Sequence, residues 1–153
     1  MSTVEESKVL EIVADVLEMD IDDVGLDAAL LDDLGADSLD IVDVAFSLGK
    51  AFGIKMPTKT VLGIVAELAP DLPVLQNFRL TELGARMLQN GPNLYTAEVA
   101  KVGASAAMVL AATSVRNWYE LCCFVASHPT KNGDLALSDF VTEFAADYLA
   151  ETV

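Results

Sequence analysis

Cysteine, histidine and basic residues are scarce in this chain of 153 residues. The only two cysteines, Cys122 and Cys123, are adjacent. Neighbouring cysteines rarely pair, because a bridge between them strains the geometry that disulfides prefer. We therefore expect two reduced thiols that pack in a core. With one histidine and no spaced pair of cysteines, the sequence predicts no metal site.

Long uncharged stretches are also missing, although 53% of the residues are hydrophobic and the mean hydropathy is +0.43. A transmembrane helix needs about 20 consecutive apolar residues, and the apolar run 102–115 is shorter than that. Charged residues near the N-terminus (Glu5, Glu6 and Lys8) interrupt any apolar segment of the kind that signal peptides contain. We expect no transmembrane segment and a cytoplasmic location.

No base occurs between Lys8 and Lys50, so the net charge of −15 is unevenly distributed. Residues 1–77 contain 16 acids and 4 bases, and ten of these acids lie between Glu18 and Asp43. Such a field repels nucleic acids and anionic membranes and attracts basic surfaces of other proteins. We therefore expect protein partners and no nucleic acid. The plainer alternative is an acidic face that only keeps the protein in solution.

Apolar residues recur at helical spacing through most of the chain, and no stretch alternates with period two for long enough to predict a strand. The fold class predicted is therefore all-α. In the second helix, Leu39, Val42 and Phe46 form one apolar line, with Asp40 and Asp43 opposite. Helices are expected at 3–17, 39–52, 57–69, 80–88, within 95–128 and at 138–150.

The most informative motif is the segment from Leu34 to Asp40, which reads Leu-Gly-Ala-Asp-Ser-Leu-Asp. It places Ser38 at the first turn of the second expected helix. Ser and Asp are good N-caps, so a purely structural role would also explain the motif. A phosphodiester on Ser38 would instead lie at the positive end of the helix dipole, beside backbone N–H groups that have no acceptor.

This motif resembles the phosphopantetheine attachment site of acyl carrier proteins. The preceding helix and the long acidic loop fit that family. The block Phe52 to Pro57, Phe-Gly-Ile-Lys-Met-Pro, is similar to the family's Phe-Gly-Ile-x-Ile-Pro step. The resemblance covers residues 3–69 and extends less clearly to residue 88. It implies an acyl carrier domain at 1–90, built as a helical bundle, and a helical C-terminal extension at 91–153.

The resemblance also implies a function. A 4′-phosphopantetheine arm would be attached covalently to Ser38, flanked by Asp37 and Leu39. The protein would be a carrier of acyl thioesters in fatty acid or specialised lipid biosynthesis, not an enzyme. Its partners would be a holo-acyl-carrier synthase and the acyl-transferring and chain-elongating enzymes, which would dock on Asp40 and Asp43. The acyl chain would fold back between the helices.

Farther along the second helix, Gly49, Lys50 and Ala51 stand where carriers of general fatty acid synthesis keep more acids. This region is more similar to specialised bacterial carriers. Some of those handle unusually long acyl chains destined for lipid A.

Two other interpretations remain at this stage. A peptidyl, aminoacyl or polyketide carrier has the same arm and a different cargo. An acidic calcium-binding protein is suggested by Asp20, Asp22 and Gly25. In an EF-hand loop, however, oxygen ligands are needed where this chain has Val24 and Leu31.

Catalysis in the extension would depend on Cys122, Cys123 and His128. The cysteines lie among apolar residues, which indicates core packing, and a histidine at a helix end more often serves as a cap. We predict no catalytic residue. The uncharged run 102–115 is too apolar for a solvated helix. We therefore expect residues 95–150 to pack on the first domain, to self-associate, to bind a dedicated partner or to cover a long acyl chain.

Overall fold

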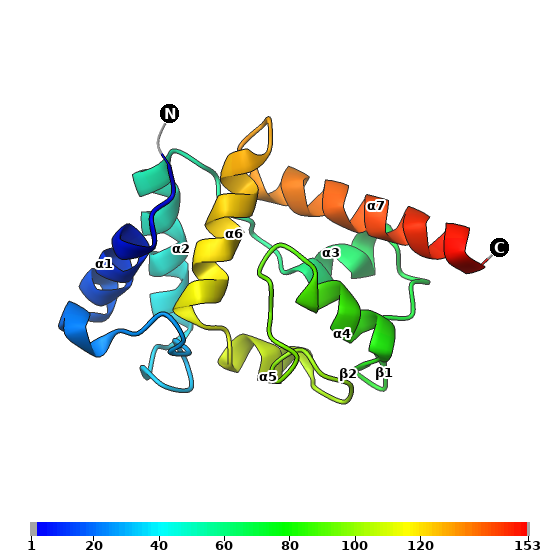
Figure 1. The fold of residues 1–153 in the computed structure, drawn as a ribbon, viewed down its shortest axis with the longest axis horizontal. Coiled ribbons are helices and arrows are strands. Elements are labelled where there is room, and N and C mark those ends of the chain that lie inside the picture. The colour runs from blue at the N-terminus through cyan, green and yellow to red at the C-terminus, as the bar shows by residue number, and fades with distance from the viewer. Residues whose placement is uncertain (1–2, 153) are drawn as a thin grey trace.

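The computed structural model describes residues 3–152, which are mostly helical (Figure 1). The all-α fold class is confirmed, with one two-stranded hairpin in addition. The elements are α1 (Glu6–Leu17), the 3₁₀ helix η1 (Ile21–Asp23), α2 (Ser38–Phe52), α3 (Val61–Leu68), β1 (Leu75–Gln76), β2 (Arg79–Leu80), α4 (Glu82–Gln89), α5 (Ala106–Ala111), α6 (Val115–Ser127) and α7 (Gly133–Thr152).

Side-chain caps explain where two helices begin. Helix α3 starts later than expected, at Val61, because the Oγ atom of Thr60 accepts a hydrogen bond from the backbone N–H of Gly63 at 3.1 Å. The apolar stretch 95–128 contains two helices, α5 and α6, with a break between them. Ser114 and Asn117 form a capping box at that break and start α6.

The hairpin of β1 and β2 was not expected from the sequence. Leu75 pairs with Leu80, and the two-residue turn between the strands is Asn77 and Phe78. Both turn residues have positive φ, 53° and 65°. This turn conformation matches the twist of a two-stranded hairpin, and strands this short leave no alternating pattern in the sequence.

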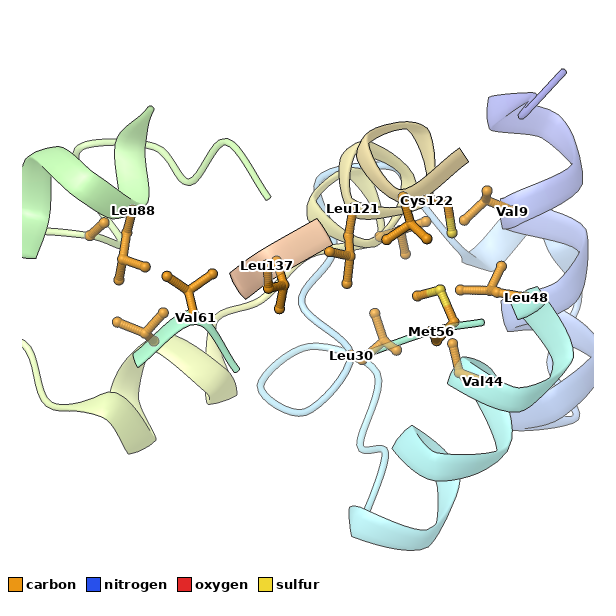
Figure 2. Close-up of a cluster of buried hydrophobic side chains, with 14 of the residues drawn as sticks. Val9, Leu30, Val44, Leu48, Met56, Val61, Leu88, Leu121, Cys122 and Leu137 are labelled. Atoms are coloured by element: carbon orange, nitrogen blue, oxygen red, sulfur yellow. The ribbon is translucent and has the colours of Figure 1, made fainter. Parts of the chain in front are cut away.

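Helices α1, α2 and α6 pack together as a bundle (Figure 1). Figure 2 shows Val9 of α1, Val44 and Leu48 of α2 and Cys122 of α6 gathered in one cluster of buried side chains. Thus α6, from the expected extension, is a main helix of the bundle that contains α2. Helix α3 packs instead against α7.

One hydrophobic core continues through the molecule. Leu137 of α7 lies between Leu121 of α6 and Val61 of α3 (Figure 2). The core therefore contains residues from both sides of position 90, and packing of the extension on the first domain is confirmed. The domain boundary at 90 stays a prediction.

The helices within residues 3–152 include none that is both long enough and apolar enough to cross a membrane.

Candidate functional site

Ser38 is the first residue of α2 and is exposed. The helix begins there because Asp37 and Asp40 form a capping box. The Asp37 carboxylate accepts a hydrogen bond from the Asp40 backbone N–H at 2.9 Å, and the Asp40 carboxylate accepts one from the Asp37 N–H at 3.0 Å. The N–H groups of Ser38 and Leu39 lie in the first turn, where no intrahelical acceptor exists. The site is therefore an accessible hydroxyl at the positive end of a helix.

The loop before Ser38 is folded on itself. Gly35 has φ +72°, a left-handed conformation that glycine adopts without strain. The next residue, Ala36, donates its N–H to the carbonyl of Leu30 at 2.9 Å. The Asp33 carboxylate accepts a hydrogen bond from the Ala29 N–H at 2.7 Å. These bonds satisfy backbone groups that a long loop would otherwise leave to water.

The same loop is bound to the segment that joins α5 and α6 and to the first turn of α6. The N–H of Leu30 donates to the carbonyl of Thr113 at 3.2 Å, and the N–H of Arg116 donates to the carbonyl of Leu26 at 2.7 Å. The Arg116 guanidinium also donates to the Asp27 carboxylate at 2.9 Å, and this contact raises the pKa of Arg116. The C-terminal part of the chain therefore holds the loop that presents Ser38.

The apolar line on α2 does not face the core. Leu39, Val42 and Phe46 are 74%, 64% and 67% exposed, whereas Val44 and Leu48 are fully buried. Helix α2 is apolar on two faces, so periodicity alone does not decide which of them is buried. The result is an exposed apolar stripe, Leu39–Val42–Phe46, that starts next to Ser38.

The two acids expected to dock partners differ in their surroundings. Asp43 is exposed on α2, whereas Asp40 is half-buried and belongs to the capping box. Asp40 therefore contributes to the helix start. Its role in docking stays a prediction, as does that of Asp43.

A cavity of about 750 Å³ opens along α2. Ligand pockets have volumes of about 300–1,000 Å³, so the cavity has the size of a ligand site. It is mainly apolar, and Figure 2 shows five of the residues that line it: Met56, Val61, Leu88, Leu121 and Leu137. Part of its wall comes from residues after position 90, chiefly Tyr95, Ala106, Val109, Leu110, Thr113 and Trp118.

No sequence pattern indicated these wall residues as functional. Their only signal was the excess of apolar residues in the extension. They come together only because α5 and α6 pack on the bundle that contains α2. Sequence reasoning considered a cover for a long acyl chain as one role of the extension, but it did not identify these residues.

Two polar side chains in the wall hydrogen-bond to each other. The hydroxyl oxygens of Tyr95 and Thr113 are 3.0 Å apart. Thr113 donates its own hydroxyl to the carbonyl of Val109 at 2.8 Å, so Tyr95 is the donor to Thr113. Burial raises the pKa of Tyr95, and the hydrogen bond to Thr113 opposes that rise. The tyrosine is therefore neutral and fixed, and it cannot serve as a base near neutral pH.

The thiols and the histidine of the extension are in structural positions. Both cysteines are free. Burial raises the pKa of Cys122 to about 12, which removes its reactive thiolate near neutral pH. Burial also raises the pKa of the half-buried Cys123. His128 ends α6, and its ring nitrogens hydrogen-bond to Thr130 at 2.8 Å and Asp139 at 2.7 Å.

Asp20, one of the two acids that suggested a calcium loop, has a local structural role. Asp20 caps η1, where its carboxylate accepts a hydrogen bond from the Asp22 N–H at 3.3 Å. Among residues 3–152, no three His, Cys, Asp or Glu side chains are grouped so that they would hold a metal ion.

Known proteins resemble the part of the chain that contains Ser38. Residues 7–69 match the family described as "Phosphopantetheine attachment site". The acyl carrier protein AcpXL of Mesorhizobium japonicum is 50% identical over 50 residues, which are 33% of this chain and 54% of that protein. AcpXL of Brucella melitensis is 48% identical over 50 residues, with the same two shares.

The acyl carrier protein of Clostridium acetobutylicum is 46% identical over 50 residues, which are 33% of this chain and 65% of that protein. The chain thus spans about half the length of the AcpXL relatives that it matches. No solved structure matches the chain.

Proposed function

We propose, on the premise that residues 7–69 belong to the phosphopantetheine attachment family, that this chain is an acyl carrier protein and that Ser38 bears its arm. Domains of this family carry 4′-phosphopantetheine covalently on a serine. The matched range contains Ser7, Ser38 and Ser47. Ser47 is in the middle of α2 and half-buried. Ser7 lies in α1. The N-cap residue of that helix makes no side-chain hydrogen bond, so Ser7 lacks the capped helix start at which Ser38 lies.

The surroundings of Ser38 fit a phosphodiester. Its hydroxyl is exposed at the first residue of α2. The N–H groups of Ser38 and Leu39 are available to the phosphate oxygens, and the helix dipole favours negative charge there. The flanking carboxylates of Asp37 and Asp40 are turned to each other's backbone N–H groups. Asp37 and Leu39 therefore shape the attachment site on either side of the serine.

The cavity along α2 suits an aliphatic cargo. Helix α2 starts at Ser38 and lines the cavity from Ile41 to Lys50, and Ile41 is only about 4.5 Å along the helix axis from Ser38. The arm supplies the thiol that holds an acyl group as a thioester. Each CH₂ group moved from water into an apolar cavity contributes about 0.8 kcal/mol. The apolar lining favours an acyl cargo over a peptidyl one.

The partners proposed are a holo-acyl-carrier synthase and the acyl-transferring and chain-elongating enzymes of fatty acid or specialised lipid biosynthesis. They would dock on the exposed Asp43 and on the stripe Leu39–Val42–Phe46, both close to Ser38. The similarity to AcpXL proteins supports the specialised pathway. A cytoplasmic location, expected from the sequence, is part of the same proposal. Cys122 keeps its proton near neutral pH, because burial raises its pKa to about 12.

The proposal is tested by co-expression with a broad-specificity holo-synthase, followed by intact mass spectrometry. We expect the wild type to gain one phosphopantetheine and Ser38→Ala to gain none. Ser7→Ala and Ser47→Ala are the matched controls and should be modified like the wild type. Modification that persists in Ser38→Ala, or that disappears in one of the controls instead, would overturn the assignment.

A further inference from the structure

The cavity along α2 is formed by two parts of the chain. One side is α2 together with residues 54–62. The other side contains residues from beyond the phosphopantetheine domain, among them Tyr95, Val109, Leu110 and Trp118. Truncated to the matched range 7–69, the chain would lack this second side. The shape of the cavity therefore depends also on residues outside the matched range that contains Ser38.

This second side is held in place relative to Ser38. Thr113, between α5 and α6, accepts a backbone hydrogen bond from Leu30 in the loop before Ser38, with an N–O distance of 3.2 Å. The Thr113 side chain binds Tyr95 and Val109, both of which line the cavity. Because one residue connects the loop and the wall, the distance from the attachment point to the wall is fixed by the fold.

The chemistry of the lining indicates an uncharged aliphatic occupant. Within the part of the chain that the structure describes, the lining contains no Asp or Glu, although the protein has 24 of these residues. A carboxylate beside a hydrocarbon chain would lose hydration without compensation. Among the described residues, the only charged groups of the cavity lining are those of the exposed lysines Lys50, Lys55 and Lys59, whose long stems are apolar.

We infer that the distal part of the acyl chain lies against residues 93–121, and that these residues set the length of chain the carrier shelters. The inference rests on the proposed carrier function. Short chains end before they reach this wall, and longer chains bury further CH₂ groups against it until the space is filled. Residues of α5 and α6 are thus specificity determinants for the cargo.

Trp118 provides a direct probe, because it is the only tryptophan of the chain and lines the cavity. The full-length protein is loaded at Ser38 from butanoyl-, octanoyl- or hexadecanoyl-coenzyme A by a broad-specificity holo-synthase. We expect the hexadecanoyl form to show a blue shift of Trp118 emission and a higher melting temperature. The butanoyl form should resemble the unacylated protein. A hexadecanoyl chain brominated near its end should quench Trp118.

Neighbouring residues of α5 give matched variants. Ala106 and Ala107 are both exposed, and only Ala106 lines the cavity. Ala106→Phe should remove most of the rise in melting temperature that the hexadecanoyl chain causes, and Ala107→Phe should keep it. Leu110→Ala and Met108→Ala form a second pair, because the two side chains are 42% and 49% exposed and only Leu110 lines the cavity.

The outcomes separate the inference from the function on which it rests. Failure of Ser38 to accept any arm would remove the proposed function. A protein that is loaded normally, but whose Trp118 is unaffected by either hexadecanoyl chain, would overturn only the inference. Equal effects of Ala106→Phe and Ala107→Phe on the hexadecanoyl form would also overturn it. The quenching measurement uses the wild-type chain and therefore does not depend on whether a variant folds.

Discussion

The carboxylates of Asp37 and Asp40 each accept a hydrogen bond from the other residue's backbone N–H, at 2.9 and 3.0 Å, with Ser38 between them. Both acids thus stabilise the start of α2 at the point where the arm would be attached. Their negative charges lie at the positive end of the helix dipole, which favours them there. The predicted docking surface and the helix cap share one residue, Asp40.

Substitutions at Asp40 and Asp43 should separate these two roles. Asp40→Ala removes half of the capping box and should lower the free energy of unfolding by about 1 kcal/mol, the typical contribution of one hydrogen bond. Asp40→Asn keeps an acceptor oxygen, so it should lower the free energy of unfolding less than Asp40→Ala does. Asp43→Ala should leave the free energy of unfolding unchanged, because the Asp43 side chain is exposed. Urea unfolding measures these differences. Equal stability of Asp40→Ala and Asp43→Ala would contradict the assignment of the cap.

The rate of modification by the holo-synthase tests the docking role of the same residues. Asp40→Asn and Asp43→Asn each remove one negative charge, so both should slow modification, and the effect should weaken as salt screens the remaining field. If neither substitution changes the rate, these acids do not steer the synthase.

The exposed stripe should contribute to docking without contributing to folding. Leu39 is 74% exposed beside Ser38, and Leu135 is 50% exposed on α7. We expect Leu39→Ala to slow modification by the holo-synthase and to leave the melting temperature nearly unchanged. The control Leu135→Ala should change neither quantity. A large loss of stability in Leu39→Ala would show that this side chain belongs to the core.

The bundle of α1, α2 and α6 should unfold as one unit. Val44 of α2 and Val125 of α6 are both fully buried, and they lie on opposite sides of position 90. Val44→Ala and Val125→Ala should each lower the free energy of unfolding by about 2 kcal/mol, because each removes two buried methyl groups and leaves a small cavity.

Circular dichroism and tryptophan fluorescence should give the same single transition for both valine variants. If Val125→Ala instead produced a separate early transition that left α1 and α2 folded, the C-terminal helices would be an independent unit.

Cys122 should make stability fall at alkaline pH. Burial raises its pKa from 9.0 to about 12. Between these values the unfolded chain releases the proton and the native protein keeps it, so the native state binds more protons and stability falls as pH rises. One such group contributes a slope of at most about 1.4 kcal/mol per pH unit.

The variant Cys122→Ala checks this prediction. Its free energy of unfolding should depend less steeply on pH above pH 9 than that of the wild type, although it starts lower because the sulfur leaves a small cavity. Tyr95 adds a slope of the same sign in both proteins, since burial raises its pKa too. Identical slopes in the two proteins would show that Cys122 titrates normally in the native state.

Local sequence patterns determined the elements around the candidate site. The motif from Leu34 to Asp40 was enough to predict that a helix begins at Ser38, because N-capping depends on residues only three positions apart. The same locality explains why the expected range 39–52 ends where α2 does, because the next residue, Gly53, adopts φ +65° as the C-cap. The all-α class followed from helical periodicity, which is also a local property.

Only the tertiary structure decided which helices surround α2 and which of its faces is exposed. Leu39 and Leu48 are both apolar residues of one helix, yet one is 74% exposed and the other fully buried. Their difference depends on α6, which starts more than 60 residues after α2 ends. Hydrophobic attraction has no direction and selects no partner from the sequence. Hence the residues next to Ser38 determine the capped helix that presents it. The cavity beside that helix exists only once α5 and α6 have packed.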